Sequence, residues 1–270
     1  MLAASRWFQL SIIVVLSAGS MALGAPPSDL ELRGLWEGED LSKMTRIAEN
    51  GDVRAQRWMG LMLRNRGRHR EAMNWYARAV SQGDGYAAGQ IADFHNHGIG
   101  VRENRVEATK WLLRGALLGD SRSQRQYAYA LRSGEHVRPD AGRAFAWYLS
   151  AARQRDPYAY LPLAQMAAAG EGTERDLVRA YAFAKAAEEA GDGSETAPAT
   201  DLKGNLREKL TRPEIAQAEA HFAALRPDLV ERRRGLDQKL LEFFALAVGL
   251  LLGGFAIRLH LRRRSRSMLG

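Results

Sequence analysis

The segment 107–120, EATKWLLRGALLGD, is an amphipathic helical pattern that ends in Gly-Asp, and the chain repeats it. The other copies read EAMNWYARAVSQGD at 71–84, RAFAWYLSAARQRD at 143–156 and RAYAFAKAAEEAGD at 179–192. Each copy begins 36 residues after the previous one. A fixed period of this length is typical of stacked repeats, in which every unit contributes one supersecondary element.

A second helical pattern lies between the copies, because residues 85–97, 121–133 and 157–169 carry apolar residues at helical spacing. Small side chains recur at two positions of this pattern, where they let two helices approach closely. They are Ala87, Ser123 and Ala159 at one position and Ala92, Ala128 and Ala164 at the other. Ala55 and Gly60 fill the same places in the first copy. The repeating unit is therefore predicted to be a helical hairpin.

Glycine and short polar residues separate the helices in register. Glycine is the residue that most readily takes the left-handed turn at a helix end, and Asn and Asp are good N-caps. The first helix of three copies ends at Gly98, Gly134 and Gly170, and the second begins after Asn104, Asp140 and Asp176. Arg155 departs from the pattern, because the other copies have glycine where it stands.

The segments GDVRAQRWMGLMLRNRGRHREAMNWYARAVSQGD and GDGYAAGQIADFHNHGIGVRENRVEATKWLLRGALLGD resemble Sel-1-like repeats, a branch of the tetratricopeptide superfamily. The GD opening, the GxGV loop and the AxxWY close carry the resemblance. It implies an all-α fold, an α/α solenoid of tetratricopeptide-like helical hairpins over residues 39–192, in which 39–50 resembles an isolated second helix and so a cap. The units are expected at 51–82, 83–118, 119–154 and 155–190.

The region that follows, residues 193–239, is predicted to close the open end of the solenoid. It begins with a linker, GSETAPAT at 193–200. Two capping helices follow, and the second opens with a capping box between Thr211 and Glu214.

Two apolar segments predict an exported chain anchored in a membrane. Residues 1–24 have an arginine, an apolar stretch and small residues in the order of a secretory signal peptide, with an uncleaved anchor as the alternative. Residues 240–261 contain 15 uncharged residues at 243–257 and are predicted to be a transmembrane helix, with a buried helix as the alternative. The basic tail, 262–270, is then cytoplasmic. We expect a single-pass protein of the inner membrane with its repeats in the bacterial periplasm.

Small residues follow one another at helical spacing along the predicted transmembrane helix. Ala245, Gly249 and Gly253 form a stripe along which a second helix can approach closely. The stripe predicts association through this helix, although glycine and alanine are also common in membrane helices that make no such contact.

The formal net charge of +8 does not predict a nucleic-acid partner, because five of the arginines lie in residues 258–270. The rest of the chain is polarised. Residues 43–155 hold 20 Lys and Arg against 10 Asp and Glu, whereas residues 156–201 hold 3 against 9. The basic part is either a solvated face or a patch for an acidic partner.

Catalytic and metal-binding patterns are absent from the sequence. The chain has no cysteine, so disulfides and thiolate chemistry are excluded. His95 and His97 are the only neighbouring histidines, and at this spacing on a helix their side chains diverge. HExxH, GxSxG and GxxxxGK[ST] do not occur. We therefore expect no cofactor, no metal and no enzymatic activity.

A binding module fits these patterns better. The resemblance implies that a concave face, lined by the first helix of each unit, holds protein partners. Arginine and tyrosine, which often dominate interface energetics, recur on that helix. The candidate partner-binding residues are Arg54, Arg57, Tyr86, Arg122, Arg125 and Tyr158. Alternatively, these side chains only cover the core.

The function expected from these patterns is that of a non-catalytic, membrane-anchored adaptor in envelope or polysaccharide-related assembly or regulation. Two alternatives remain at this point. One is an adaptor of the endoplasmic-reticulum degradation type, and the other is an envelope carbohydrate-binding protein or enzyme.

Overall fold

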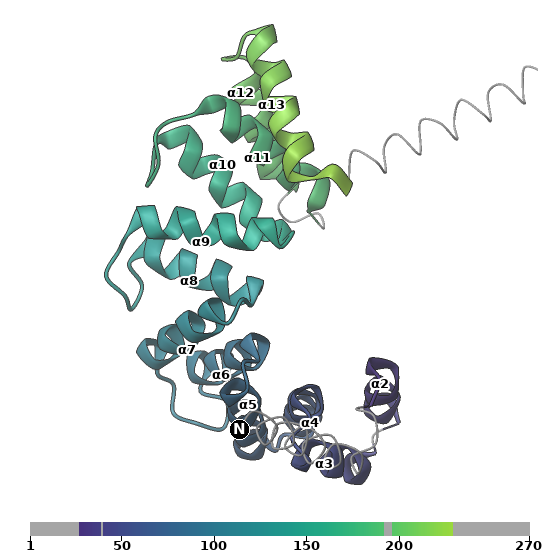
Figure 1. Ribbon diagram of the computed structural model, residues 1–270. Coiled ribbons are helices and arrows are strands. Elements are labelled where there is room, and N and C mark those ends of the chain that lie inside the picture. The colour runs from purple at the N-terminus through teal and green to yellow at the C-terminus, as the bar shows by residue number, and fades with distance from the viewer. Residues whose placement is uncertain (1–26, 39, 192–195, 229–270) are drawn as a thin grey trace, which may run out of the picture. The chain divides into compact units, whose positions relative to one another are not determined.

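The computed structural model describes residues 27–38, 40–191 and 196–228, and all regular secondary structure in these residues is helical. The described residues divide into two compact units, one that ends at residue 139 and one that begins at residue 140. The first unit contains α2 (Asp29–Glu37), α3 (Leu41–Glu49), α4 (Val53–Asn65), α5 (His69–Ser81), α6 (Gly85–His97), α7 (Arg105–Leu117) and α8 (Ser121–Ser133) (Figure 1). The second contains α9 (Ala141–Arg153), η1 (Pro157–Ala159), α10 (Tyr160–Ala169), α11 (Leu177–Ala190), α12 (Thr196–Arg207) and α13 (Arg212–Leu225).

The predicted all-α class is confirmed for this part of the chain. The predicted signal peptide, 1–24, the predicted transmembrane helix, 240–261, and the tail, 262–270, lie outside the described residues. None of the helices within 27–38, 40–191 and 196–228 combines the length and the hydropathy needed to cross a membrane.

Each first helix begins at an aspartate that caps it. The carboxylates of Asp52 and Asp84 accept a hydrogen bond at 2.9 Å from the backbone N–H three residues ahead, and that of Asp120 does so at 2.7 Å. The second helices α7, α9 and α11 are capped in the same way by Asn104, Asp140 and Asp176, as the sequence predicts. Such caps satisfy N–H groups that have no partner inside the helix.

The first helices end in the left-handed conformation that glycine favours. Gly98, Gly134 and Gly170 have φ angles of 65°, 77° and 76°. Two other residues with positive φ are not glycine: His136 at 60° and Arg155 at 66°. In the other copies glycine takes these places, Gly100 and Gly172 for the first and Gly83 and Gly119 for the second.

A buried polar side chain links successive hairpins at one repeating position. Gln56 and Gln124 donate from Nε2 to the carbonyl oxygens of Ala48 and Ala116, at 3.1 and 3.2 Å. Tyr160 occupies the same register and donates from its hydroxyl to the carbonyl oxygen of Ala152 at 3.0 Å. Each acceptor lies near the C-terminal end of the preceding second helix. The bond therefore ties one hairpin to the next where both are buried.

Close packing between the two helices of a hairpin depends on small residues, as the sequence indicates. Gly60 on α4 faces the buried ring of Tyr76 on α5, and a Cβ atom at this glycine would lie 2.6 Å from Cδ1 of the ring. Tyr76 has no accessible surface, and its ring packs edge-on against Phe94 of α6 with 6.0 Å between the ring centres. The second helix α5 and the first helix α6 of the next repeat are thus in direct aromatic contact.

Three elements differ from the expectation. α2 is a helix that the sequence reading does not assign, and Ser28 and Glu31 form a capping box at its start. The fourth first helix is divided into η1 and α10, with Pro157 at the beginning of η1. α12 begins at Thr196, inside the segment 193–200 for which a linker is predicted. Ala199 is fully buried there, and its packing stabilises this first turn of the helix.

The C-terminal end of the described chain is held by a buried arginine. Arg226 is 7% exposed, its guanidinium lies 5.7 Å from the ring centre of Tyr160, and it donates to Asp228 at 3.0 and 3.1 Å. The hydrogen bond from Arg226 lowers the pKa of Asp228 to about 2.

We expect Gly60→Ala to lower the free energy of unfolding by about 2 kcal/mol, because the new methyl group meets the fixed ring of Tyr76. Alanine is the better helix former, so propensity alone predicts the opposite sign. Gly204→Ala is the matched control, since nothing lies within 4 Å of a Cβ there. This control is expected to stabilise the chain by about 0.5 kcal/mol. Urea denaturation followed by circular dichroism measures both, and equal effects would contradict the packing argument.

The ion pair at Asp228 predicts a dependence of stability on pH. The pKa of Asp228 in the folded chain, about 2, lies below the reference value of 3.8. The ionised carboxylate therefore contributes its full stabilisation at pH values above 3.8. This contribution is lost as the pH falls from about 5 toward about 2. Melting temperatures over this range should therefore fall more steeply for the unmodified chain than for Asp228→Asn. Asp201→Asn, which removes another carboxylate of the same unit, should follow the unmodified chain.

Candidate functional site

A groove crosses the first helices of the first unit, with a volume of about 380 Å³. Residues of α2, α4 and α6 line it, so it spans two repeats and the helix that precedes them. We call it the α4 groove, and its lining residues are Asp29, Arg33, Arg57, Trp58, Leu61 and Tyr86.

The apolar part of the α4 groove is anchored in the core. The ring of Trp58 packs against Trp36 of α2 with 5.5 Å between ring centres, and both rings lie against the buried residues of the unit. Tyr86 is half-buried, and the guanidinium of Arg57 lies 5.7 Å from the centre of its ring. Two aromatic side chains are therefore presented at fixed positions with part of their surface open.

The charged groups of the α4 groove are paired with one another or with its neighbours. Arg57 lies 3.2 Å from Asp84, the residue that caps α6. Arg33 is 2.7 Å from Glu37, and Asp29 accepts a hydrogen bond from Arg54 at 2.7 Å. These three pairs carry no net charge. The groove thus suits a side chain with an apolar body, and the paired groups at its rim supply hydrogen-bond donors and acceptors.

Arg54 lies beside this groove and holds α2 in place. Its Nη2 donates to the carbonyl oxygen of Pro27 at 2.6 Å and to Asp52 at 3.1 Å. The hydrogen bonds to Asp52 and Asp29 raise the pKa of Arg54 above its ordinary value. One arginine therefore joins α2 to the cap of α4.

The structure brings some of the predicted partner-binding residues together and leaves others apart. Arg57 and Tyr86 line the α4 groove, and Arg54 borders it. Arg122 and Arg125 belong to α8, where Arg122 lies 3.1 Å from Asp93 of α6. Tyr158 belongs to η1 in the second unit and is half-buried. Their role in binding a partner stays a prediction.

The other lining residues are not predicted by the repeat, for two different reasons. Asp29 and Arg33 belong to α2, which the sequence reading does not assign, and Trp58 and Leu61 look like core positions when α4 is considered alone. One signal was available in the sequence. Ser28 and Glu31 have the spacing of a capping box, which predicts the start of a helix and hence an additional wall on α4.

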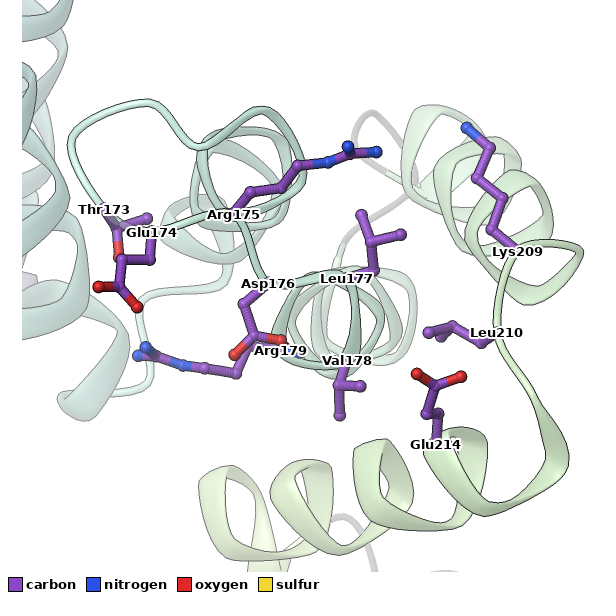
Figure 2. Close-up of a pocket in the computed structure, with 10 residues that line it drawn as sticks. All are labelled: Thr173, Glu174, Arg175, Asp176, Leu177, Val178, Arg179, Lys209, Leu210 and Glu214. Carbon is purple, nitrogen blue, oxygen red and sulfur yellow. Dashed lines mark hydrogen bonds between the residues drawn. The ribbon is translucent and has the colours of Figure 1, made fainter.

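A second hollow, of about 480 Å³, lies in the second unit between the start of α11 and the turn that joins α12 to α13 (Figure 2). Leu210 and Glu214 extend into it from the α12–α13 side, opposite Leu177 and Val178 of α11. The remaining lining residues are Thr173, Glu174, Arg175, Asp176, Arg179 and Lys209.

Several charged groups of this second hollow already stabilise the fold. Asp176 caps α11 by accepting the N–H of Arg179 at 2.9 Å, and Glu214 accepts from Thr211 in the capping box of α13. Arg179 lies over the rings of Phe145 and Phe183 at 5.8 and 5.9 Å. We therefore regard the α4 groove as the stronger candidate site.

No group of three or more His, Asp or Glu side chains that could hold a metal ion occurs in the part of the chain that the structure describes. His95 and His97 lie in the last turn of α6, where His97 is exposed and His95 is half-buried. Nor do the residues of the α4 groove include a nucleophile beside a general base.

Solved structures with this fold include a Sel1 repeat protein from Oxalobacter formigenes. It is similar to the chain with 25% sequence identity and a TM-score of 0.55, over 69% of this chain and 78% of that one. A protective antigen of uropathogenic Escherichia coli with an SLR fold is 23% identical, with a TM-score of 0.48, over 73% of this chain and 51% of that one. No curated protein sequence matches the chain.

The Sel1 repeat family matches four consecutive segments of the chain, at 53–84, 85–120, 121–156 and 157–192. Each segment runs from the start of a first helix, just after its capping aspartate, to the aspartate of the next repeat. The matches follow one another without a gap and cover more than half of the 270 residues. The chain therefore belongs to the Sel1 repeat family.

Proposed function

We propose that the protein is a non-catalytic adaptor that binds a protein partner in the α4 groove. Sel1 repeats are protein-interaction scaffolds, and the α4 groove is the observation that assigns this role to a particular surface. Trp58 and Tyr86 offer aromatic area at a low entropic cost, because packing and the contact with Arg57 already restrict them. The open surface of these two rings suits an exposed segment of a partner that carries a bulky apolar side chain.

The proposal includes anchoring of this scaffold at a membrane. The apolar run at 243–257 and the signal-like segment at 1–24 support an exported, single-pass protein with its repeats in the periplasm and its helix–helix contact at Ala245, Gly249 and Gly253. Anchoring confines the adaptor to a surface, and its partners are then gathered at a higher local concentration.

Arg57 contributes to the stability of the fold as well as to the α4 groove, so substitutions there must be checked for their effect on stability. We expect Arg57→Gln to lower the free energy of unfolding by less than about 1 kcal/mol, because its ion pair with Asp84 is more than one-third exposed on the arginine side. Arg57→Glu should cost more, because it places a second carboxylate beside the one that caps α6. Chemical denaturation of both variants measures this difference. If the two variants are equally stable, the ion pair does not hold α4 to α6.

Partner capture tests the groove directly. Full-length protein is used as bait on detergent-solubilised membranes from its own source, and the captured proteins are identified by mass spectrometry. We expect Tyr86→Ser to reduce the capture of the specific partner about tenfold, as the loss of an aromatic anchor does at many interfaces.

The matched control is Tyr129→Ser, which removes a 54% exposed tyrosine of the same unit from outside the groove. This variant should capture the partner as the unmodified chain does. Circular dichroism of both variants checks that the helices are retained. A partner that is captured equally well by Tyr86→Ser would exclude the α4 groove as its binding site.

A further inference from the structure

The first unit has an edge rich in arginine, formed by the turns that join first helices to second helices and by the first residues of α5 and α7. The side chains at this edge are exposed, and lysine is absent from it. We call it the arginine edge, and its members are Arg66, Arg68, Arg70, Arg102, Arg105 and Arg138.

The fold brings the first two of these turns into contact. Gly100, in the α6–α7 turn, packs on the start of α5 so closely that a Cβ atom there would lie 2.5 Å from Cβ of His69. Ile99 and Val101 on either side of this glycine pack against the core of the unit. The turn is therefore fixed, and Arg102 is held on the same edge as the arginines that flank His69.

Carboxylates at this edge already show which chemistry it favours. Glu71 accepts two hydrogen bonds from Arg68, at 2.6 and 2.7 Å, and this contact lowers the pKa of Glu71. Glu103 accepts one from Arg105 at 2.8 Å. With Glu135, the edge has three exposed carboxylates against its six exposed arginines, so positive charge remains in excess.

The excess of positive charge is confined to the first unit and is not a property of the repeat. The position of Arg102 is occupied by Arg138 one period later and by Glu174 in the next copy. The turn around Glu174 carries Glu171 and Asp176 and only one arginine, Arg175. The same turn is therefore basic in one unit and acidic in the other.

We propose that the arginine edge binds an extended acidic segment of a protein partner. This inference rests on the proposed role of the chain as a protein-interaction scaffold. The planar guanidinium group matches a carboxylate with two parallel hydrogen bonds, as Arg68 and Glu71 already do. The carboxylates interspersed among the arginines suit a peptide, whose acidic groups are spaced, better than a polymer with a phosphate at every unit.

Two other classes of anionic partner fit the edge less well. Binding of single-stranded nucleic acid relies on several aromatic side chains that stack on successive bases. The three turns themselves contain no Phe, Tyr or Trp, and the exposed Tyr129 beside them donates from its hydroxyl to Glu135 at 3.4 Å. Insertion into a lipid surface needs exposed apolar side chains, whereas Ile99 and Val101 face the core.

A labelled decapeptide in which glutamate alternates with glycine serves as the probe, with the full chain in non-ionic detergent and binding followed by fluorescence anisotropy. The double variant Arg70→Gln and Arg102→Gln should weaken binding about fivefold at moderate salt. The matched control is Arg78→Gln with Arg114→Gln, which removes two exposed arginines from the last turns of α5 and α7, away from the edge. Binding to this control should change less than about twofold.

Equal weakening in both double variants would overturn the proposal, because it would mean that only the overall charge matters. The proposal also fails if vesicles of phosphatidylglycerol and phosphatidylcholine, or a single-stranded oligonucleotide, bind at the edge more tightly than the peptide. Tyr86→Ser should leave peptide binding unchanged, since Tyr86 belongs to the α4 groove. Failure at the edge is thereby distinguished from failure of the groove.

Discussion

The stacking of the hairpins depends on one constraint: helix ends are buried where one hairpin meets the next, and their backbone groups need partners there. An aspartate at the start of each first helix accepts the N–H groups, and Gln56, Gln124 and Tyr160 donate to carbonyl groups of the preceding helix. A buried backbone group without a partner costs about 1 to 3 kcal/mol. These side chains therefore maintain the register of the repeats, while the small residues set the distance between helices.

Much of the fold follows from local chemistry and could be predicted from the sequence. The 36-residue period, the capping residues and Gly98, Gly134 and Gly170 locate the repeat helices to within a few residues. Elements outside the repeat are harder to predict, because no second copy in the sequence supports them. α2 is stabilised by contacts of Leu32, which is fully buried, and these contacts come from other helices. α12 starts early for the same reason, through the burial of Ala199.

The candidate site was predictable only in part. Repetition on the first helix identifies Arg57 and Tyr86, but it says nothing about α2, which completes the α4 groove. It also gives equal weight to Arg54, whose hydrogen bonds to Asp29 and Pro27 show a structural role. The repeat position of a residue thus identifies the face of the helix on which it lies. Whether an arginine there is open to a partner or bonded within the fold depends on the neighbouring side chains. The turns vary in the same way, because the repeat position held by Arg102 carries the opposite charge at Glu174.

His136 and Arg155 have a left-handed backbone in places where the other copies have glycine, and both lie within the third repeat, 121–156. Such a conformation costs a residue with a side chain about 1 to 2 kcal/mol. In repeat proteins, contacts between adjacent units can offset such a local cost. A turn of the stack therefore does not require glycine. The third repeat carries a side chain at both positions where adjacent copies have none, and each such side chain gives this unit a surface of its own.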